Sequence, residues 1–316
     1  MENTLFQALQ VRFIKVRFTL TFTQDSELPQ NKIPFLRDGM KSALIRRNCV
    51  RNGICRECDF CAECTAGKIA YPSDVPEDFR TEDSSGETGY LLECESSKTS
   101  WKAEETLDFY LTLFGKTIVY FRQIADAFRD LGTDTQLCGK QYGFTVTSIR
   151  NFEKEKIFDN SGMHMQKLVV HKVLDYVMFR KFRMEDAMEI NSVIIILDSM
   201  LTLEQNRTYL QGYRIESILD AVKRRLHALN SFENRKCELR EAAEPLPADL
   251  KQKAHLRGTA YYSNYTSQKM EMQGLKGSIQ LSGITEDILD LLIAGELLHI
   301  GTNFEFGYGR YHLKST

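Results

Sequence analysis

Val16-Arg17-Phe18-Thr19-Leu20-Thr21-Phe22-Thr23 alternates strictly between apolar and polar side chains. Because successive side chains of a strand point to opposite faces of a sheet, this alternation predicts a strand with one buried face. Pro34 follows, and a proline suits the first turn of a helix because its missing N–H is not needed there. Leu36, Met40 and Leu44 then recur at a helical interval, which predicts a helix after the strand.

The same order of elements continues through the first half of the chain. Residues 73–97 are acidic and rich in turn formers, so they are expected to form a surface excursion. After a weak strand, the alternation at 107–113 predicts a further strand. Apolar residues on one face of 121–131 predict a helix that ends at Gly132, and 144–147 predicts a closing strand. This is the element order of a ferredoxin-like domain.

The second half of the chain resembles the first in outline. The expected elements are a strand at 193–197, a helix at 215–229, a loop at 238–253, strands at 256–263 and 275–282, a helix at 284–294 that stops at Gly295, and a strand at 303–313. The predicted fold class is therefore α+β, with tandem ferredoxin-like (RRM-like) domains and a central cleft. The N-terminal domain would span 1–155 with an inserted cysteine-rich loop at 49–75. The C-terminal domain would span 156–316 with a glycine-rich loop at 301–310.

Composition and charge narrow the classes of function. The chain has 316 residues, of which 42% are hydrophobic and 27% charged, as expected of a globular protein with room for two domains. A formal net charge of −2 excludes a uniformly basic nucleic-acid coat protein but is compatible with a local basic groove. No apolar run approaches the ~18 residues of a membrane helix, and the first residues do not resemble a signal peptide. A cytoplasmic protein with no membrane partner is expected.

The most distinctive segment is a glycine-rich tail, Gly295-Glu-Leu-Leu-His299-Ile-Gly301-Thr-Asn-Phe-Glu-Phe-Gly307-Tyr-Gly309-Arg310-Tyr311. Glycines let a backbone approach a ligand closely, and their N–H groups can face phosphates. Arg310 can bind a phosphate through two nitrogens, and Phe306, Tyr308 and Tyr311 can stack on bases. The alternative is an edge strand with glycine bulges and ordinary core aromatics.

This tail resembles the C-terminal signature of the CRISPR precursor-RNA-processing endoribonucleases, which belong to the RAMP superfamily. Gly274 and Gly277 match the family's G-x-x-G turn. Leu298-His299-Ile300-Gly301 and Phe306-Gly307-Tyr308-Gly309-Arg310-Tyr311 match its glycine-rich loop. Weaker likeness extends upstream to the first predicted helix, and the family's two ferredoxin-like domains agree with the order of elements predicted from the residues.

The resemblance implies a reaction and its partners. Such enzymes cut CRISPR repeat RNA without a metal, so no cofactor for catalysis is implied. The 2′-hydroxyl attacks the adjacent phosphate and leaves a 2′,3′-cyclic phosphate and a 5′-hydroxyl. Implied partners are the repeat RNA, the crRNA product and other subunits of a CRISPR effector complex. The alternative is a non-catalytic RAMP subunit that binds guide RNA within such a complex.

The candidate catalytic residues depart from the family pattern. Many members keep a histidine in or just after the first helix, but this chain has none before His164. Histidine suits proton transfer near neutral pH, and His299 matches a family histidine beside the glycine loop, so the resemblance implies His299 as the catalytic histidine. Lys269 and Arg310 are the nearest candidate cations for the phosphate. His255 and His312 are the reserve candidates.

A basic stretch and the glycines supply candidate RNA contacts. Between residues 36 and 56 lie six cations against only Asp38, and such local charge attracts phosphates. The predicted RNA-binding residues are Arg37, Lys41, Arg46, Arg47, Gly274, Gly277, Gly301, Gly307, Gly309 and Arg310. The alternative for the cations is a solvated helix face with favourable charges at its C-terminal end.

Closely spaced cysteines form a candidate metal site at Cys55, Cys58, Cys61 and Cys64. Four thiolates at this spacing can wrap one metal ion, and zinc is favoured over an iron–sulfur cluster because the downstream Cys-Pro of such clusters is missing. The alternative is a reduced cysteine-rich loop without metal. A third interpretation of the whole chain is a redox or zinc protein in which this loop is the functional part.

Overall fold

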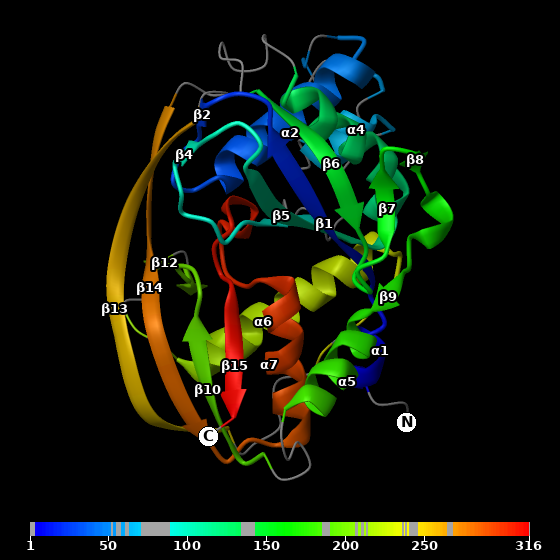
Figure 1. Cartoon of the computed structure of the whole chain (residues 1–316). Coiled ribbons are helices and arrows are strands. Elements are labelled where there is room, and N and C mark those ends of the chain that lie inside the picture. The colour runs from blue at the N-terminus through cyan, green and yellow to red at the C-terminus, as the bar shows by residue number, and fades with distance from the viewer. Residues whose placement is uncertain are drawn as a thin grey trace. The chain divides into compact units, whose positions relative to one another are not determined.

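The computed structural model describes residues 4–51, 53–54, 58–60, 63–70, 89–133, 143–184, 190–205, 208–209, 212, 214–235, 237, 239, 246–263 and 268–315. Only the backbone is described at residues 70, 204–205, 208–209, 232, 249–250, 254, 259–263 and 268–272. The chain divides into two compact units (Figure 1). The N-terminal unit comprises 13–170 with 263–268, and the C-terminal unit comprises the residues up to 12 with 171–262 and 269–316. Within the described residues, no helix is both long and apolar enough to span a bilayer.

The N-terminal unit is built on a sheet of strand order β3-β5-β1-β6-β7-β8. Its elements are β1 (Arg12–Phe22), β2 (Ser26–Glu27), α2 (Ile33–Asn48), α3 (Thr65–Ala70), β3 (Tyr90–Glu93), β4 (Ser100–Trp101), β5 (Thr106–Phe114), a 3-10 helix (Gly115–Tyr120), α4 (Phe121–Leu131), β6 (Phe144–Arg150), β7 (Lys156–Asp159), β8 (Gly162–Met163) and a 3-10 turn (Met165–Lys167). Strands β3, β5, β1 and β6 have the ferredoxin-like order. The predicted helix around Pro34 and the predicted helix end at Gly132 are confirmed.

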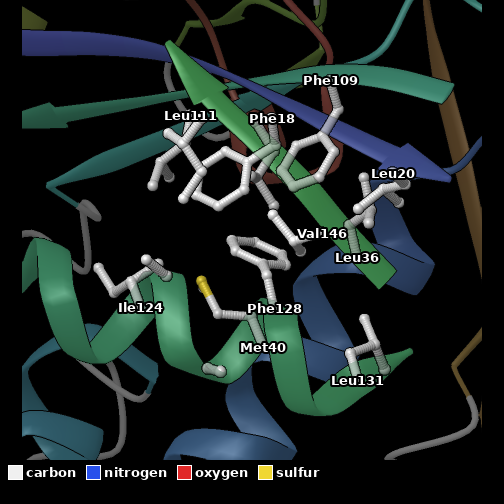
Figure 2. Packing of buried hydrophobic residues seen from close by; sticks show 14 of the residues in the cluster. Phe18, Leu20, Leu36, Met40, Phe109, Leu111, Ile124, Phe128, Leu131 and Val146 are labelled. Atoms are coloured by element: carbon white, nitrogen blue, oxygen red, sulfur yellow. The ribbon is translucent and has the colours of Figure 1, made fainter. Parts of the chain in front are cut away.

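Apolar side chains of the sheet and of helices α2 and α4 form the core of this unit (Figure 2). Phe18 of β1 stacks on Phe109 of β5 with ring centroids 4.8 Å apart. Phe128 of α4 contacts both rings, and Met40 of α2 is buried in the same cluster. Aromatic pairs in such geometries contribute beyond the area that they bury. The alternation of β1 therefore directs one face of the strand into this core, as the sequence predicts.

Strand β3 corrects the predicted surface excursion at 73–97. Tyr90, Leu91, Leu92 and Glu93 are all buried, and the strand pairs with β5. Residues 71–88 lie outside the described residues. The prediction was wrong for the strand because composition was averaged over a window much longer than four residues, so the acidic neighbours concealed a short apolar run.

The C-terminal unit has the same architecture. Its elements are α1 (Thr4–Ala8), β9 (His171–Lys172), α5 (Val173–Arg183), β10 (Ser192–Leu197), β11 (Glu204–Gln205), β12 (Thr208–Tyr209), α6 (Ile215–Phe232), β13 (Ala248–Ser263), β14 (Gln268–Ser282), α7 (Glu286–Leu298), a 3-10 turn (Phe304–Phe306) and β15 (Tyr311–Ser315). The main sheet has the order β13-β14-β10-β15, which is again ferredoxin-like. The tandem ferredoxin-like fold predicted from the sequence is confirmed.

Three boundaries in the C-terminal unit differ from their predictions. Strand β13 begins at Ala248, inside the predicted loop 238–253. Helix α7 runs through Gly295 to Leu298. A Cβ at Gly295 would lie 2.1 Å from the Tyr311 hydroxyl, so this glycine serves close packing and does not end the helix. The predicted strand 303–313 reduces to β15 from Tyr311, because the preceding residues turn back on the sheet.

A buried carboxylate ties helix α5, which the sequence analysis missed, to the core of the C-terminal unit. Glu296 of α7 accepts hydrogen bonds from Nε and Nη2 of Arg180, both at 2.8 Å, and from the Tyr176 hydroxyl at 3.3 Å. It also accepts from the backbone N–H of Leu313. The hydrogen bonds to Glu296 raise the pKa of Arg180 above its ordinary value. Polar side chains of α5 make these contacts with the core. A prediction of helices from hydrophobic periodicity therefore does not detect α5.

The first residues of the chain pack within the C-terminal unit. Nδ2 of Asn230 donates to Ala8 O at 2.9 Å, and Nη2 of Arg235 donates to Gln10 O at 2.8 Å. The backbone N–H of Leu174 donates to Leu9 O at 2.9 Å. These first residues thus belong to the C-terminal unit. The boundary at residue 155 and the central cleft stay predictions.

Candidate nucleic-acid interface

One face of the C-terminal sheet packs on helix α7. We call the opposite face of this sheet the open face. Tyr311 and Leu313 of β15 are buried, and the Tyr311 hydroxyl donates to Leu292 O of α7 at 2.6 Å. Burial raises the pKa of Tyr311 well above its ordinary value. Because side chains alternate along a strand, His312 and Lys314 project from the open face. Both are exposed.

A groove of about 750 Å³ lies on the open face. Its lining residues are Ile194, Ile196, Leu197, Met200, His255, Arg257, Lys276, Gly277, Ser278 and Lys314. Three of them are exposed cations, Arg257 of β13, Lys276 of β14 and Lys314 of β15, and none of the lining residues that the structure describes is acidic. A groove with cations on three strands and no acidic residue attracts polyanions. We call it the basic groove.

Strand register builds the floor of the basic groove. On β10, Val193, Ile195 and Leu197 are buried, whereas the residues between them are partly exposed. Ile194 pairs with Lys314 of β15, and Ile196 pairs with Ser278 of β14. The floor is therefore apolar at its centre and has polar or basic side chains beside it, an arrangement that suits bases and phosphates together.

A histidine and an aspartate meet at the edge of the same face. Nδ1 of His312 lies 2.9 Å from Oδ1 and 3.1 Å from Oδ2 of Asp198, the residue that follows β10. Nε of Arg310 lies 3.9 Å from Oδ2 of the same carboxylate. The backbone N–H of Asp198 donates to Arg310 O at 3.0 Å, which fixes the two segments together. Arg310, predicted to bind phosphate, thus already faces one anion.

The glycine-rich loop 301–310 folds back on the segment after β10. The N–H of Gly309 donates to Met200 O at 2.7 Å, and that of Gly307 donates to Phe304 O at 2.9 Å. Gly309 O accepts from the N–H of Ile300 at 3.1 Å. Both glycine N–H groups therefore have backbone partners in this conformation and do not point at a free anion. The predicted role of Gly307 and Gly309 in RNA binding stays a prediction.

The other predicted glycines differ in their surroundings. A Cβ at Gly301 would lie 2.2 Å from Thr202 O, and a Cβ at Gly274 would lie 2.9 Å from Thr202 Oγ1. These two glycines thus let the segments around Gly274 and Gly301 pack closely on Thr202. Leu201 and Leu275 form a backbone bridge at the same place. Gly277 alone among the five lines the basic groove.

The structure describes the side chain of only one of the two predicted catalytic residues. His299 ends α7 with a φ of 51° and is fully buried, at 0% exposed. A general base must reach the proton that it abstracts, and a buried imidazole offers no surface for RNA in this conformation. Lys269 lies in β14, and its side chain is outside the described part of the chain. Both assignments stay predictions.

The aromatic residues of the tail are core residues. Phe306 and Tyr308 form a small buried cluster with Met200, and Tyr311 is 2% exposed. The expectation that they stack on bases is wrong for this conformation, and the alternative of ordinary core aromatics is confirmed. The physical reason is the turn back at 304–310, which directs these rings into the sheet and away from solvent.

The four basic residues of α2 do not form a free cationic surface. Nη2 of Arg47 donates to Asp130 of α4 at 2.7 Å, and Nη1 lies 3.9 Å from Asp126. The hydrogen bond to Asp130 raises the pKa of Arg47 above its ordinary value. Nη1 of Arg37 lies 3.3 Å from Asp38, and Lys41 is buried at 7% exposed. Arg46 is exposed. Their predicted contacts with RNA stay predictions.

Replacing Arg47 with alanine tests these two roles against each other. We expect Arg47→Ala to lower the free energy of unfolding by about 1 kcal/mol, because a half-exposed ion pair joining α2 to α4 is lost. Affinity for RNA should stay within about twofold, since both carboxylates already neutralise this guanidinium. Urea unfolding and filter binding measure the two quantities, with Arg46→Ala as the matched control. A larger loss of RNA affinity than of stability would restore Arg47 as an RNA contact.

The described cysteines of the candidate metal site border a cavity. Cys58 and Cys64 line it together with Cys49, and its volume is about 410 Å³. The backbone N–H groups of Arg51 and Gly53 point at the Cys49 sulfur, at 3.4 and 3.1 Å. Cys55 and Cys61 lie outside the described residues, and among the described residues no group of three or more His, Cys, Asp or Glu side chains is placed to hold a metal. The zinc site stays a prediction.

The three cations of the basic groove were not among the residues predicted from the sequence. Lys276 lies between the two glycines of the matched G-x-x-G turn, whereas Arg257 and Lys314 are distant in the chain and belong to no matched motif. The signal that could have found them is alternation: Lys276 and Ser278 alternate with buried Leu275 and Ile279, so their outward side chains are predictable once the strands are paired.

Comparisons with families of known proteins match both parts of the chain. A model of the CRISPR-associated endoribonuclease Cas6 matches residues 195–311. A model described as the AF_1859_N N-terminal domain matches residues 9–171, about half of the chain. A search of curated proteins gives no match.

Two solved structures of similar fold are described as Cas6 complexes. The chain resembles one in a partial complex of Cas6-RT-Cas1 with Cas2, with 12% identity and a TM-score of 0.58 over 97% of this chain and 46% of that one. It also resembles a Cas6 in a product complex, with 10% identity and a TM-score of 0.52 over 96% of this chain and 100% of that one. The chain thus spans less than half of the first structure, and at these identities the likeness shows a shared fold.

Proposed function

We propose that this chain, a Cas6-like member of the RAMP family, binds and cleaves CRISPR repeat RNA. Cleavage proceeds by attack of a 2′-hydroxyl on the adjacent phosphate, without a metal. The products are a 2′,3′-cyclic phosphate and a 5′-hydroxyl. The family match supplies the class of substrate, and the basic groove supplies a surface on this chain that suits it.

The basic groove carries the proposal. Arg257, Lys276 and Lys314 lie on three strands of one sheet and line one groove, in which no described lining residue is acidic. An RNA strand laid across the open face can place successive phosphates against these cations and bases against the apolar floor at Ile194 and Ile196. Sheet surfaces of ferredoxin-like domains are well suited to single-stranded RNA because they are flat and open.

The reaction needs groups that the open face provides. A base must take the 2′-hydroxyl proton, and cations must stabilise the charge on the pentacoordinate phosphorus. His255 lines the groove, and His312 lies at its edge beside Ile196, with which it pairs across β10 and β15. The cations of the groove can stabilise the charged phosphorane.

A cleavage assay with end-labelled repeat RNA from the same locus tests the proposal. In the presence of EDTA we expect a single cut, because the attacking group belongs to the RNA and no metal-bound water is needed. A 2′-deoxy substitution at the cut site should abolish cleavage while leaving binding intact. A cut that survives the 2′-deoxy substitution, or that disappears with EDTA, would contradict this mechanism.

A non-cleaving RAMP subunit that binds guide RNA is the second candidate. The burial of His299 supports it, because the histidine implied by family resemblance does not reach the surface. Such a subunit would use the same basic groove and would bind repeat RNA tightly without cutting it. Tight binding without a cut in the same assay would favour this candidate. In either case we propose other CRISPR proteins as partners, in view of the complexes in which similar folds occur.

A further inference from the structure

We propose that His312, held by Asp198, is the general base of this RNA cleavage, an inference that rests on the proposed function. Its imidazole would take the proton of the attacking 2′-hydroxyl. Nothing in the tail motif indicates this residue, because it lies one position after the last match to the motif, Tyr311. Its setting in the open face singles it out.

His312 is accessible and lies beside the basic groove. Its side chain is 48% exposed. It pairs with Ile196 of the groove floor across the two strands, and Lys314 projects from the same face of β15 two residues later. Directly opposed residues of an antiparallel pair have Cβ atoms about 5 Å apart, so an RNA on the groove floor passes within reach of this imidazole.

Asp198 gives the imidazole the form that a base requires. Its carboxylate can only accept hydrogen bonds, so Nδ1 of His312 carries the proton and donates at 2.9 Å. The tautomer so selected leaves Nε2 unprotonated and able to accept a proton. Asp198 is thus a positioning residue. The backbone bond from Asp198 N to Arg310 O fixes the carboxylate to the start of β15, which carries the histidine.

The other described histidines are set differently, including His171, which begins β9 and does not line the groove. His299 is fully buried, and Nδ1 of His227 bonds to Cys237 O at 2.7 Å in a structural contact. Nε2 of His164 lies 3.5 Å from Asp159, but this pair belongs to the β7–β8 turn of the N-terminal unit. His255 lines the groove without a carboxylate partner among the described side chains. His312 is therefore the described histidine that is exposed, has a carboxylate partner and lies beside the basic groove.

The proton and the bonds balance in the proposed step. The 2′-oxygen gives its proton to Nε2 of His312 and forms a bond to the adjacent phosphorus. The bond from phosphorus to the 5′-oxygen breaks, and the leaving 5′-oxygen takes a proton from water. The imidazolium then returns its proton to solvent, which reaches it because the side chain is half exposed.

Single-turnover cleavage of repeat RNA by His312→Ala tests the proposal. We expect the rate constant to fall on the order of 10²- to 10⁴-fold, with an unchanged Kd for the uncleavable 2′-deoxy RNA. Added imidazole should restore part of the lost rate, which a purely structural role would not allow. Asp198→Asn should lower the rate less and should not respond to imidazole, because its own histidine still fills the position.

Two control variants make the result decisive. His312→Gln keeps a side chain that can hydrogen-bond to Asp198 and should be as inactive as alanine, so loss of packing is separated from loss of the base. His164→Ala removes the other surface histidine that lies beside an aspartate and should cleave like the wild-type protein. A cleavage rate of His312→Ala within about twofold of wild type, or loss of cleavage in His255→Ala instead, would overturn the role of His312. The proposed enzyme activity would still stand. A wild-type protein that binds but never cuts would overturn the proposed enzyme itself.

Discussion

Removing the three cations of the basic groove together should weaken RNA binding about a hundredfold. In Arg257→Ala/Lys276→Ala/Lys314→Ala, three phosphate contacts are lost, and each contributes about 1 kcal/mol. Their sum of about 3 kcal/mol corresponds to a factor of about 100 in Kd. The slope of log Kd against log salt should fall by about 2, because fewer counterions are released from a single strand. Filter binding over a salt series measures both quantities.

A charge-matched control separates the groove from the net charge of the protein. Lys156→Ala/Lys167→Ala/Lys172→Ala removes the same charge from exposed positions outside the groove. Its Kd and salt slope should stay close to those of the wild-type protein. An equal loss of RNA affinity in the two triple variants would mean that binding depends only on the net charge. The basic groove would then not be the RNA-binding surface.

Gly309→Ala should lower the free energy of unfolding by about 3 kcal/mol. A Cβ at this position would lie 1.8 Å from Ile300 O, and the backbone has a φ of +74°. An L residue at such a φ costs about 1 kcal/mol or more, and relieving the overlap requires the backbone to move, at a further cost of about 2 kcal/mol. The shift would also disturb the bond from Gly309 N to Met200 O. Urea unfolding monitored by circular dichroism measures the loss.

Gly283→Ala is the matched control for that variant. Gly283 has a similar φ of +71°, but no other group lies within 4 Å of the Cβ that alanine would add. Its substitution should therefore cost only the dihedral part, about 1 kcal/mol. Equal losses at both positions would show that the contact with Ile300 relaxes freely, and the glycine would then be explained by its dihedral angle alone.

The fold followed from the sequence where hydrophobic period and turn residues agreed. The alternation of 16–23 and the apolar face of 121–131 specify a strand and a helix with one buried face each, and the structure contains β1 and α4 there. Glycine was harder to interpret. Gly132 ends a helix, whereas Gly295 lies inside one because Tyr311 packs against it. Sequence alone does not distinguish these two uses, since the deciding neighbour is distant in the chain.

The candidate site was less predictable than the fold. Resemblance pointed to the glycine-rich tail, yet its glycines and aromatic rings serve packing in this structure. The groove cations come from strands β13, β14 and β15, and only strand pairing shows that they share a face. The same holds for Asp198 and His312, which are 114 residues apart in the chain. A motif marks residues that are near in sequence, and this surface is assembled from residues that are not.

The packing of the first residues within the C-terminal unit has a consequence for synthesis. Asn230 closes its bond to Ala8 across a separation of 222 residues. A ribosome that adds about 5–20 residues per second needs on the order of 10–40 s to travel that distance. Ala8 is therefore made long before Asn230 exists, whereas Arg17 of β1 pairs with Arg150 of β6, which follows it by only 133 residues. The backbone of Ala8 would therefore keep an open hydrogen-bonding position until Asn230 has been made.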